Sequence, residues 1–271
     1  MEYLEVLQGL FFLSSIDKNW SLGIKDKIES VFQRAYLKER FERDLPYQKK
    51  NIQSILSKVF GYLLKSKDSL SVSDTPVDQD WISSFFNKIQ DVSREDAQEI
   101  WAKILAQEIT EPESISLQTL HILSTLGKKD AEKFRSLCSY VIGYEMVLNP
   151  TKFIFKDGSS DTFDFLSLQE IGLIHSIQGS GDLSITIGND VNDSCFLIQI
   201  GNKKFNLLED NSVLKNVELS FPATVPLTRA GSELCKIVLD STDVLSKHEI
   251  VLKQINEILK ENYTLQEVQT N

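Results

Sequence analysis

The spacing of the apolar residues changes near residue 150, and this change limits the folds that the chain can adopt. Before it, apolar side chains recur every three or four residues, which is typical of amphipathic helices. After it, short runs such as LSITI and KFNLL are separated by Gly, Asn and Asp, which is typical of strands and turns. We therefore expect an α+β protein, in which an all-α helical bundle precedes a smaller mixed α/β domain.

Composition and turn residues divide the 271 residues into five predicted segments. Residues 1–66 are expected to form basic amphipathic helices, 67–78 a linker rich in Ser and Asp, and 79–148 the helical bundle. The mixed α/β domain is expected over 149–240, and a C-terminal helix with a polar tail over 241–271.

Capping residues predict where the helices of the bundle begin and end. Ser93 is the expected N-cap of a helix that ends before Pro112, and Ser116 is the expected N-cap of the next. Gly127 is expected at the C′ position of that helix, and a further helix is predicted over 129–142.

The helix after Pro46 carries an apolar face that is close to a heptad seam. Either a helical hairpin or a contact between two copies of the chain would bury this face. The residues predicted for self-association are Ile52, Leu56, Val59 and Leu63. We accordingly expect a homo-oligomer.

The net charge of −10 is unevenly distributed along the chain. Residues 25–66 hold ten Lys or Arg and five Asp or Glu, whereas residues 150–271 hold ten basic and seventeen acidic side chains. A polyanion contact is therefore expected near the N-terminus, where basic residues could neutralise phosphates without reading sequence. The candidates for this contact are Arg34, Lys38, Arg40, Arg43, Lys49 and Lys50. The alternative is a solvated helix face that neighbouring carboxylates partly balance.

Motifs that would carry chemistry are absent from the sequence. The three cysteines form no C-x-x-C pair and the three histidines are isolated, so we expect buried free thiols and no metal site. Neither a Gly-rich phosphate loop nor a nucleophile elbow occurs, and we predict no cofactor, no catalytic residues and no enzymatic activity. The longest apolar run is too short to span a bilayer, which indicates a cytoplasmic protein without membrane contact.

Residues 48–143 resemble a bacterial domain family of unknown function. The resemblance rests on QEIWAKILAQE at 98–108 followed by PESISLQTL at 112–120, preceded by PVDQDWI at 76–82. That family usually has Gly where this chain has Glu113, and Arg where this chain has Gln118. The resemblance implies a bacterial cytosolic protein from a setting of mobile elements and phage defence, and it implies no activity.

Six residues of this signature are predicted to be structural: Asp80, Trp81, Trp101, Glu108, Ser116 and Thr119. The tryptophans lie at helical spacing, where aromatic side chains are usually core, although a ligand-stacking surface is the alternative. Asp80 is expected in the first turn of a helix, where the dipole favours an anion. Glu108 is expected either to pair with Lys103 or to cap a neighbouring helix.

The C-terminal part resembles a remote, enlarged winged helix. The runs LSLQEIGLI and LTRAGSEL are similar to the helix-to-strand segments on either side of a wing. The helix predicted over 163–171, which Gly172 ends, has no Lys or Arg and contains Asp164 and Glu170. A helix that reads bases in the major groove would carry cations and amides, so sequence-specific DNA binding through it is not expected.

We interpret the chain as a non-enzymatic interaction or adaptor protein of a bacterial cytoplasm, in antiphage defence, that self-associates and docks a protein partner. One alternative is sequence-tolerant nucleic-acid binding through the basic N-terminal helices. The other is an enzyme whose site has no recognisable motif.

Overall fold

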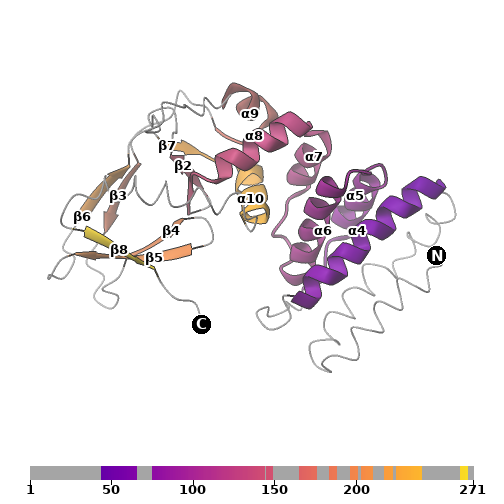
Figure 1. Ribbon diagram of the computed structural model, residues 1–271, viewed down its shortest axis with the longest axis horizontal. Coiled ribbons are helices and arrows are strands. Elements are labelled where there is room, and N and C mark those ends of the chain that lie inside the picture. Colours follow the sequence, from indigo (N-terminus) through magenta and orange to yellow (C-terminus); the bar gives the residue numbers. More distant parts are fainter. Residues whose placement is uncertain are drawn as a thin grey trace. The chain divides into compact units, whose positions relative to one another are not determined.

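The computed structural model divides the chain into two compact units, Met1–Thr125 and Leu126–Asn271 (Figure 1). The described residues of the first unit form helices, and those of the second form helices and antiparallel strands, as expected for an α+β protein. The structure describes residues 44–65, 75–143, 145–148, 165–175, 183–187, 196–200, 203–209, 217–221, 224–239 and 263–267. Residues 1–43 of the predicted N-terminal helical segment and residues 241–262 of the predicted C-terminal segment lie outside these residues.

The first unit contains four described helices: α4 (Pro46–Lys65), α5 (Gln79–Ile89), α6 (Glu95–Thr110) and α7 (Leu117–Thr125). α4 packs mainly on α6, and α5 packs on α7. The bundle therefore includes α4, which we had assigned to a separate N-terminal segment, because α4 supplies the apolar face that covers α6.

This packing corrects the predicted self-association seam. Ile52, Leu56, Val59 and Leu63 are only 0–3% exposed within a single chain. The apolar face of α4 is thus part of the core of the first unit, and these four side chains do not offer a surface to a second copy. Of the two ways to bury a heptad-like seam, the structure shows helix packing within the chain.

The aromatic residues of the signature form the centre of this core. The ring of Trp81 stacks on that of Phe85 at 5.2 Å between centroids, and Phe85 meets the ring of Trp101 edge to face at 5.6 Å. Both tryptophans are buried, as predicted, and offset or edge-on rings add about 1 kcal/mol per pair beyond their burial.

Two predicted helix boundaries are wrong. The N-cap of α6 is Arg94 rather than Ser93, and no side chain caps that helix. The helix predicted over 129–142 is α8 (Lys128–Cys138), which ends early because Val141 belongs to a strand. Gly127 does lie at the predicted C′ position of α7, but it is also the N-cap of α8, and its φ of −68° is one that any residue can adopt.

The second unit is built around antiparallel strands. Six of them form one sheet in the order β7-β2-β1-β4-β5-β8, and β3 pairs separately with β6. The strands are β1 (Val141–Ile142), β2 (Met146–Leu148), β3 (Leu183–Ile187), β4 (Phe196–Ile200), β5 (Lys203–Glu209), β6 (Val217–Phe221), β7 (Thr224–Pro226) and β8 (Tyr263–Glu267). The last of these lies in the predicted polar tail, for which no strand was predicted, and β8 pairs with β5 from Glu209↔Tyr263 to Phe205↔Glu267.

α9 (Phe165–Ile171) ends at the predicted glycine. Gly172 has a φ of +87°, its N–H donates to the carbonyl of Gln169 at 3.0 Å, and the Leu173 N–H donates to the carbonyl of Leu168 at 2.9 Å. These two bonds form a Schellman motif, in which a left-handed residue lets the chain leave the helix at once.

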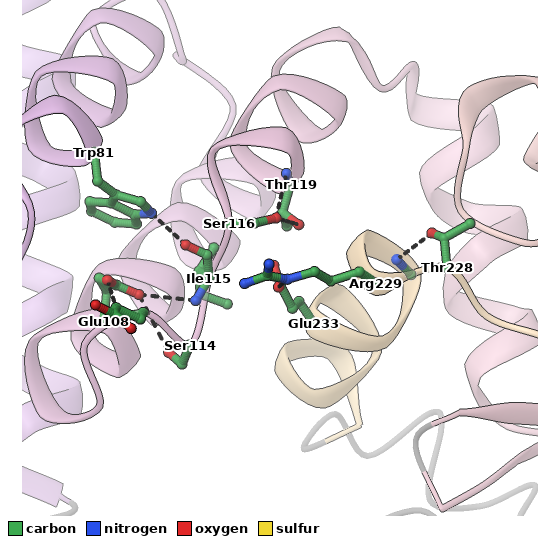
Figure 2. A network of polar contacts seen from close by, with 11 residues as sticks. Trp81, Glu108, Ser114, Ile115, Ser116, Thr119, Thr228, Arg229 and Glu233 are labelled. Atoms are coloured by element: carbon green, nitrogen blue, oxygen red, sulfur yellow. Dashed lines mark hydrogen bonds and ion pairs between the residues drawn. The ribbon is translucent and has the colours of Figure 1, made fainter.

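The chain segment that follows α9 is joined to the segment that precedes α10 (Arg229–Val238), although Leu173 and Leu227 are 54 positions apart. Ile174 and Leu227 form an antiparallel bridge, and the Thr228 N–H donates to the Leu173 carbonyl at 3.1 Å. Thr228 is the N-cap of α10, as predicted, since its Oγ1 accepts the Gly231 N–H at 3.1 Å (Figure 2). The two segments that resemble the flanks of a wing therefore lie side by side.

Candidate interaction site

Glu108 holds the loop between α6 and α7 by its buried carboxylate. The side chain is 1% exposed, and its Oε1 accepts the Glu113 N–H at 2.8 Å. Its Oε2 accepts the Ile115 N–H at 3.0 Å and lies 3.4 Å from the Ser114 hydroxyl (Figure 2). Glu108 therefore has a structural role, as predicted, but these partners belong to the loop that leads into α7 and not to the first turn of a helix.

Trp81 holds the same loop from the other side. Its indole Nε1 donates to the Ile115 carbonyl at 2.7 Å, while the Ile115 N–H is bound to Glu108 (Figure 2). Both backbone groups of this one buried residue are thus satisfied by side chains from two different helices. Since buried backbone groups without partners are costly, the loop conformation depends on this pair of side chains.

Ser116 takes the helix-capping role predicted for it, and Thr119 is structural, as predicted. The Ser116 Oγ accepts the Thr119 N–H at 3.3 Å and lies 3.0 Å from the Thr119 hydroxyl (Figure 2). Thr119 is buried, and the Ser116 pattern is that of an N-cap on the first turn of α7. Asp80 lies exposed in the first turn of α5, also as predicted, and the N-cap of that helix is Asp78.

Glu113 is the one non-glycine residue in the described part of the chain with a positive φ, at 70°. A side chain in this left-handed region costs about 1 kcal/mol relative to glycine. The Glu108 carboxylate imposes this conformation by binding the N–H groups of Glu113 and Ile115 together. Local strain that buried contacts maintain is often found at binding sites.

The surface around the loop is acidic. The Trp81–Ile115 hydrogen bond brings the start of α5 beside the loop, and no Lys or Arg occurs in residues 75–87 or 104–127. Leu117 adds an apolar side chain that is 48% exposed. We call the exposed side chains Asp78, Asp80, Glu111, Glu113 and Leu117 the acidic loop face.

We expect the Glu113→Gly variant to be more stable than the natural chain by up to about 1 kcal/mol, because glycine relieves the left-handed strain. The neighbouring Glu111→Gly variant is the control, since Glu111 has an ordinary φ of −132° and should lose about 0.5–1 kcal/mol there. Urea unfolding followed by tryptophan fluorescence measures both, because all three tryptophans belong to the first unit. Equal shifts in the two variants would contradict the assigned strain.

A second polar cluster joins α4 to α6 on the partly exposed side of the unit. Lys58 Nζ lies 2.7 Å from Glu99 Oε1 and 3.4 Å from Glu95 Oε1, and the Tyr62 hydroxyl donates to Glu99. The hydrogen bonds from Lys58 and Tyr62 lower the pKa of Glu99, and burial together with the Glu99 carboxylate raises the pKa of Tyr62. The cluster explains how α4 is oriented on α6.

The lowered pKa of Glu99 predicts a pH dependence of stability. A carboxyl group with a depressed pKa in the folded state stabilises it above the unfolded pKa, and this contribution is lost as the pH falls through the folded pKa. We expect the urea midpoint of the Glu99→Gln variant to fall less between neutral and acidic pH than that of the natural chain. The difference should be small, because solvent screens this partly exposed cluster. The control is the Glu95→Gln variant, which lacks the more distant and more exposed carboxylate partner of Lys58. Its urea midpoint should fall with pH almost as much as that of the natural chain.

The predicted polyanion site is described only in part. Lys49 and Lys50 lie near the start of α4, whose first turn holds no acidic residue, and Lys50 is exposed. Arg34, Lys38, Arg40 and Arg43 lie outside the described residues, as does Asp164.

Within the described part of the chain, no three His, Cys, Asp or Glu side chains are placed to hold a metal ion. The same residues include no helix that is long and apolar enough to cross a bilayer.

Ile115 and Glu113 are central to the site, but neither was predicted from the sequence. No side-chain pattern points to Ile115, because its backbone makes the contacts, and a glutamate at position 113 gives no sign of a left-handed residue.

Comparison with known proteins places the chain in a family but assigns no activity. A family model described as "Protein of unknown function (DUF2806)" matches residues 33–248. No curated protein and no solved structure matches the chain.

Proposed function

Because the chain belongs to this DUF2806 family of unknown function, its role has to be inferred from its own residues, and we propose that it is a non-enzymatic interaction protein. The acidic loop face would be its docking surface for a protein partner. The observation that carries this proposal is the loop itself, whose backbone Glu108 and Trp81 fix in a partly strained conformation.

The use of the signature side chains supports binding rather than catalysis. Trp81 and Glu108 are buried and bound to the loop backbone, and Ser116 caps α7. These groups stabilise a shape, and a rigid loop loses little conformational entropy when a partner binds it. Loops held by a rigid scaffold are also where binding residues are usually found.

The charge of the face indicates the chemistry of the partner. The face combines four exposed carboxylates with the exposed Leu117, and the two stretches of sequence that supply it have no Lys or Arg to balance the charge. A basic protein segment with an apolar side chain would complement this surface, and complementary charges would speed its association. A partner that is acidic, or a polyanion, would be repelled.

The cellular role in our proposal is that of an adaptor in the cytoplasm of a bacterium, in antiphage defence, as the family resemblance implies. Self-association remains a prediction. It would need a surface other than the face of α4 that carries Ile52, Leu56, Val59 and Leu63, since the core of the first unit buries them. The winged-helix arrangement of the second unit likewise remains a proposal, supported by the joined segments at Leu173 and Leu227.

Affinity purification from the native host tests the docking surface. The natural chain and the Glu111→Lys/Glu113→Lys variant would serve as baits, with and without nuclease and with and without phage challenge. We expect a nuclease-resistant protein partner whose affinity for the variant falls roughly 10- to 100-fold. A matched control carries the same charge change at Glu132 and Glu170, two exposed carboxylates of the second unit. The proposal fails if the loop variant and the natural chain capture the same proteins equally well.

Nucleic-acid binding through the N-terminal basic residues is the second candidate. Lys49 and Lys50 near the start of α4, whose first turn holds no acidic residue, favour it, because the helix dipole adds to their positive potential. The test is fluorescence anisotropy with labelled DNA or RNA of unrelated sequences at about 50 mM salt, where phosphate contacts are strongest. Binding should be sequence-tolerant and salt-sensitive, and it should be lost when Arg40, Arg43, Lys49 and Lys50 are replaced by Glu. No binding at that salt concentration would exclude this candidate.

A further inference from the structure

Two cysteines that are far apart in sequence meet in the core of the second unit. Cys138 is the last residue of α8 and Cys235 lies in the middle of α10, and these two helices pack together. Both thiols are free and buried, and the side chain of Cys235 lies close enough to that of Cys138 to raise its pKa. Cys195 lies outside the described residues.

The surroundings of the pair keep it unreactive while the unit is closed. Burial is the main cause that raises the pKa of the Cys138 thiol, and the contact with Cys235 raises it further. Since the thiolate is the nucleophile in disulfide exchange, a buried protonated thiol reacts slowly. Reaction therefore requires the unit to open locally, which exposes one thiol to an oxidant.

We propose that Cys138 and Cys235 form a reversible oxidation site, at which a small disulfide oxidant such as glutathione disulfide converts the paired thiols into a disulfide between α8 and α10. One protein thiolate attacks a sulfur of the oxidant, which forms a mixed disulfide and releases one glutathione. The second protein thiolate then attacks the protein sulfur of that mixed disulfide, which forms the Cys138–Cys235 bond and releases the second glutathione. The protein loses two electrons and two protons, and glutathione disulfide is reduced to two glutathione thiols.

The bond would lock most of the second unit. The two cysteines are 97 positions apart, and the residues between them include β1 to β7 and α9. A cross-link that closes so long a loop restricts the unfolded chain strongly, and we expect the melting temperature of the second unit to rise by about 10 °C.

The experiment uses the full chain with Cys195→Ser, so that the pair is the only source of thiols. The protein is incubated with glutathione disulfide in buffer and in urea below the unfolding midpoint, then quenched with acid, alkylated and digested. Mass spectrometry should show the Cys138 and Cys235 peptides joined with the loss of two hydrogens, sooner in urea than in buffer. A reductant should reverse both the joining and the rise in melting temperature, which circular dichroism follows.

A variant with Cys235→Ser in the same background is the control, and its melting temperature should not respond to the oxidant. The proposal is overturned if both cysteines remain alkylatable in both conditions, or if glutathione stays attached to one of them without transfer. A joined pair that lowers the melting temperature would overturn it as well, because the bond would then strain the packing of α8 on α10.

Discussion

Replacing Glu108 with alanine is expected to lower the free energy of unfolding of the first unit by about 4 kcal/mol, because the loop loses its buried hydrogen-bond acceptor. The backbone N–H groups of Glu113 and Ile115 would both lose their carboxylate partner. Each unsatisfied buried donor costs about 1–3 kcal/mol, and the space left by the side chain adds to the loss. Urea unfolding followed by tryptophan fluorescence measures the change in the unit that contains all three tryptophans.

The control for this prediction is Glu111→Ala, an exposed neighbour that should change stability by less than about 0.5 kcal/mol. The free energy of unfolding of the Glu108→Gln variant should lie between those of Glu108→Ala and Glu111→Ala, since its amide oxygen can accept only some of the hydrogen bonds that the carboxylate accepts. Trp81→Phe removes the other side-chain contact to Ile115. The double variant with Glu108→Ala should lose less unfolding free energy than the sum of the losses in the two single variants. A Glu108→Ala variant as stable as Glu111→Ala would show that the loop does not depend on the carboxylate.

Local signals were sufficient for several elements of the fold. Gly172 ends α9 because the Schellman motif needs a left-handed residue, and Thr228 caps α10 because its hydroxyl reaches the first-turn N–H groups. The aromatic spacing in α5 and α6 predicted a core, and Trp81 and Trp101 are buried in it. In each case the deciding interaction lies within a few residues or on one helix face.

The errors arise where a distant contact decides. The face of α4 with Ile52 and Leu56 looks the same whether a helix of the same chain or a second copy covers it. Val141 continues the helical spacing of α8, yet it pairs with Val147 and so belongs to a strand. The segment Tyr263–Glu267 is polar, but its backbone pairs with β5, which its side chains do not reveal.

The candidate site was predictable in its residues but not in its geometry. Buried carboxylates need partners, so a structural role for Glu108 followed from its place beside an apolar helix face. Its actual partners are backbone N–H groups five and seven residues further along the chain, and the turn that presents them depends on the left-handed Glu113. Periodicity carries no information on such a turn.

The second large effect is expected in the second unit, where Gly231→Ala should cost about 3 kcal/mol or more. A methyl group built on Gly231 would lie 2.0 Å from the carbonyl oxygen of Leu173. That oxygen cannot move away easily, because it accepts the Thr228 N–H and its segment is bridged to Leu227. α10 would have to shift, and the junction between the two flanking segments would open.

The buried thiols of Cys138 and Cys235 report this opening, since the second unit contains no tryptophan. Their alkylation in the folded protein, followed by peptide mass spectrometry, should be about 100-fold faster in the Gly231→Ala variant, as 3 kcal/mol corresponds to about two factors of ten. Gly61→Ala is the matched control in the first unit: no atom lies within 4 Å of its added methyl group. Because alanine favours the helix interior of α4, that variant should gain about 0.5–1 kcal/mol. The same substitution is therefore expected to lower stability at Gly231 and to raise it at Gly61. An unchanged rate of thiol alkylation in Gly231→Ala would contradict this prediction, because it would mean that α10 tolerates displacement from Leu173.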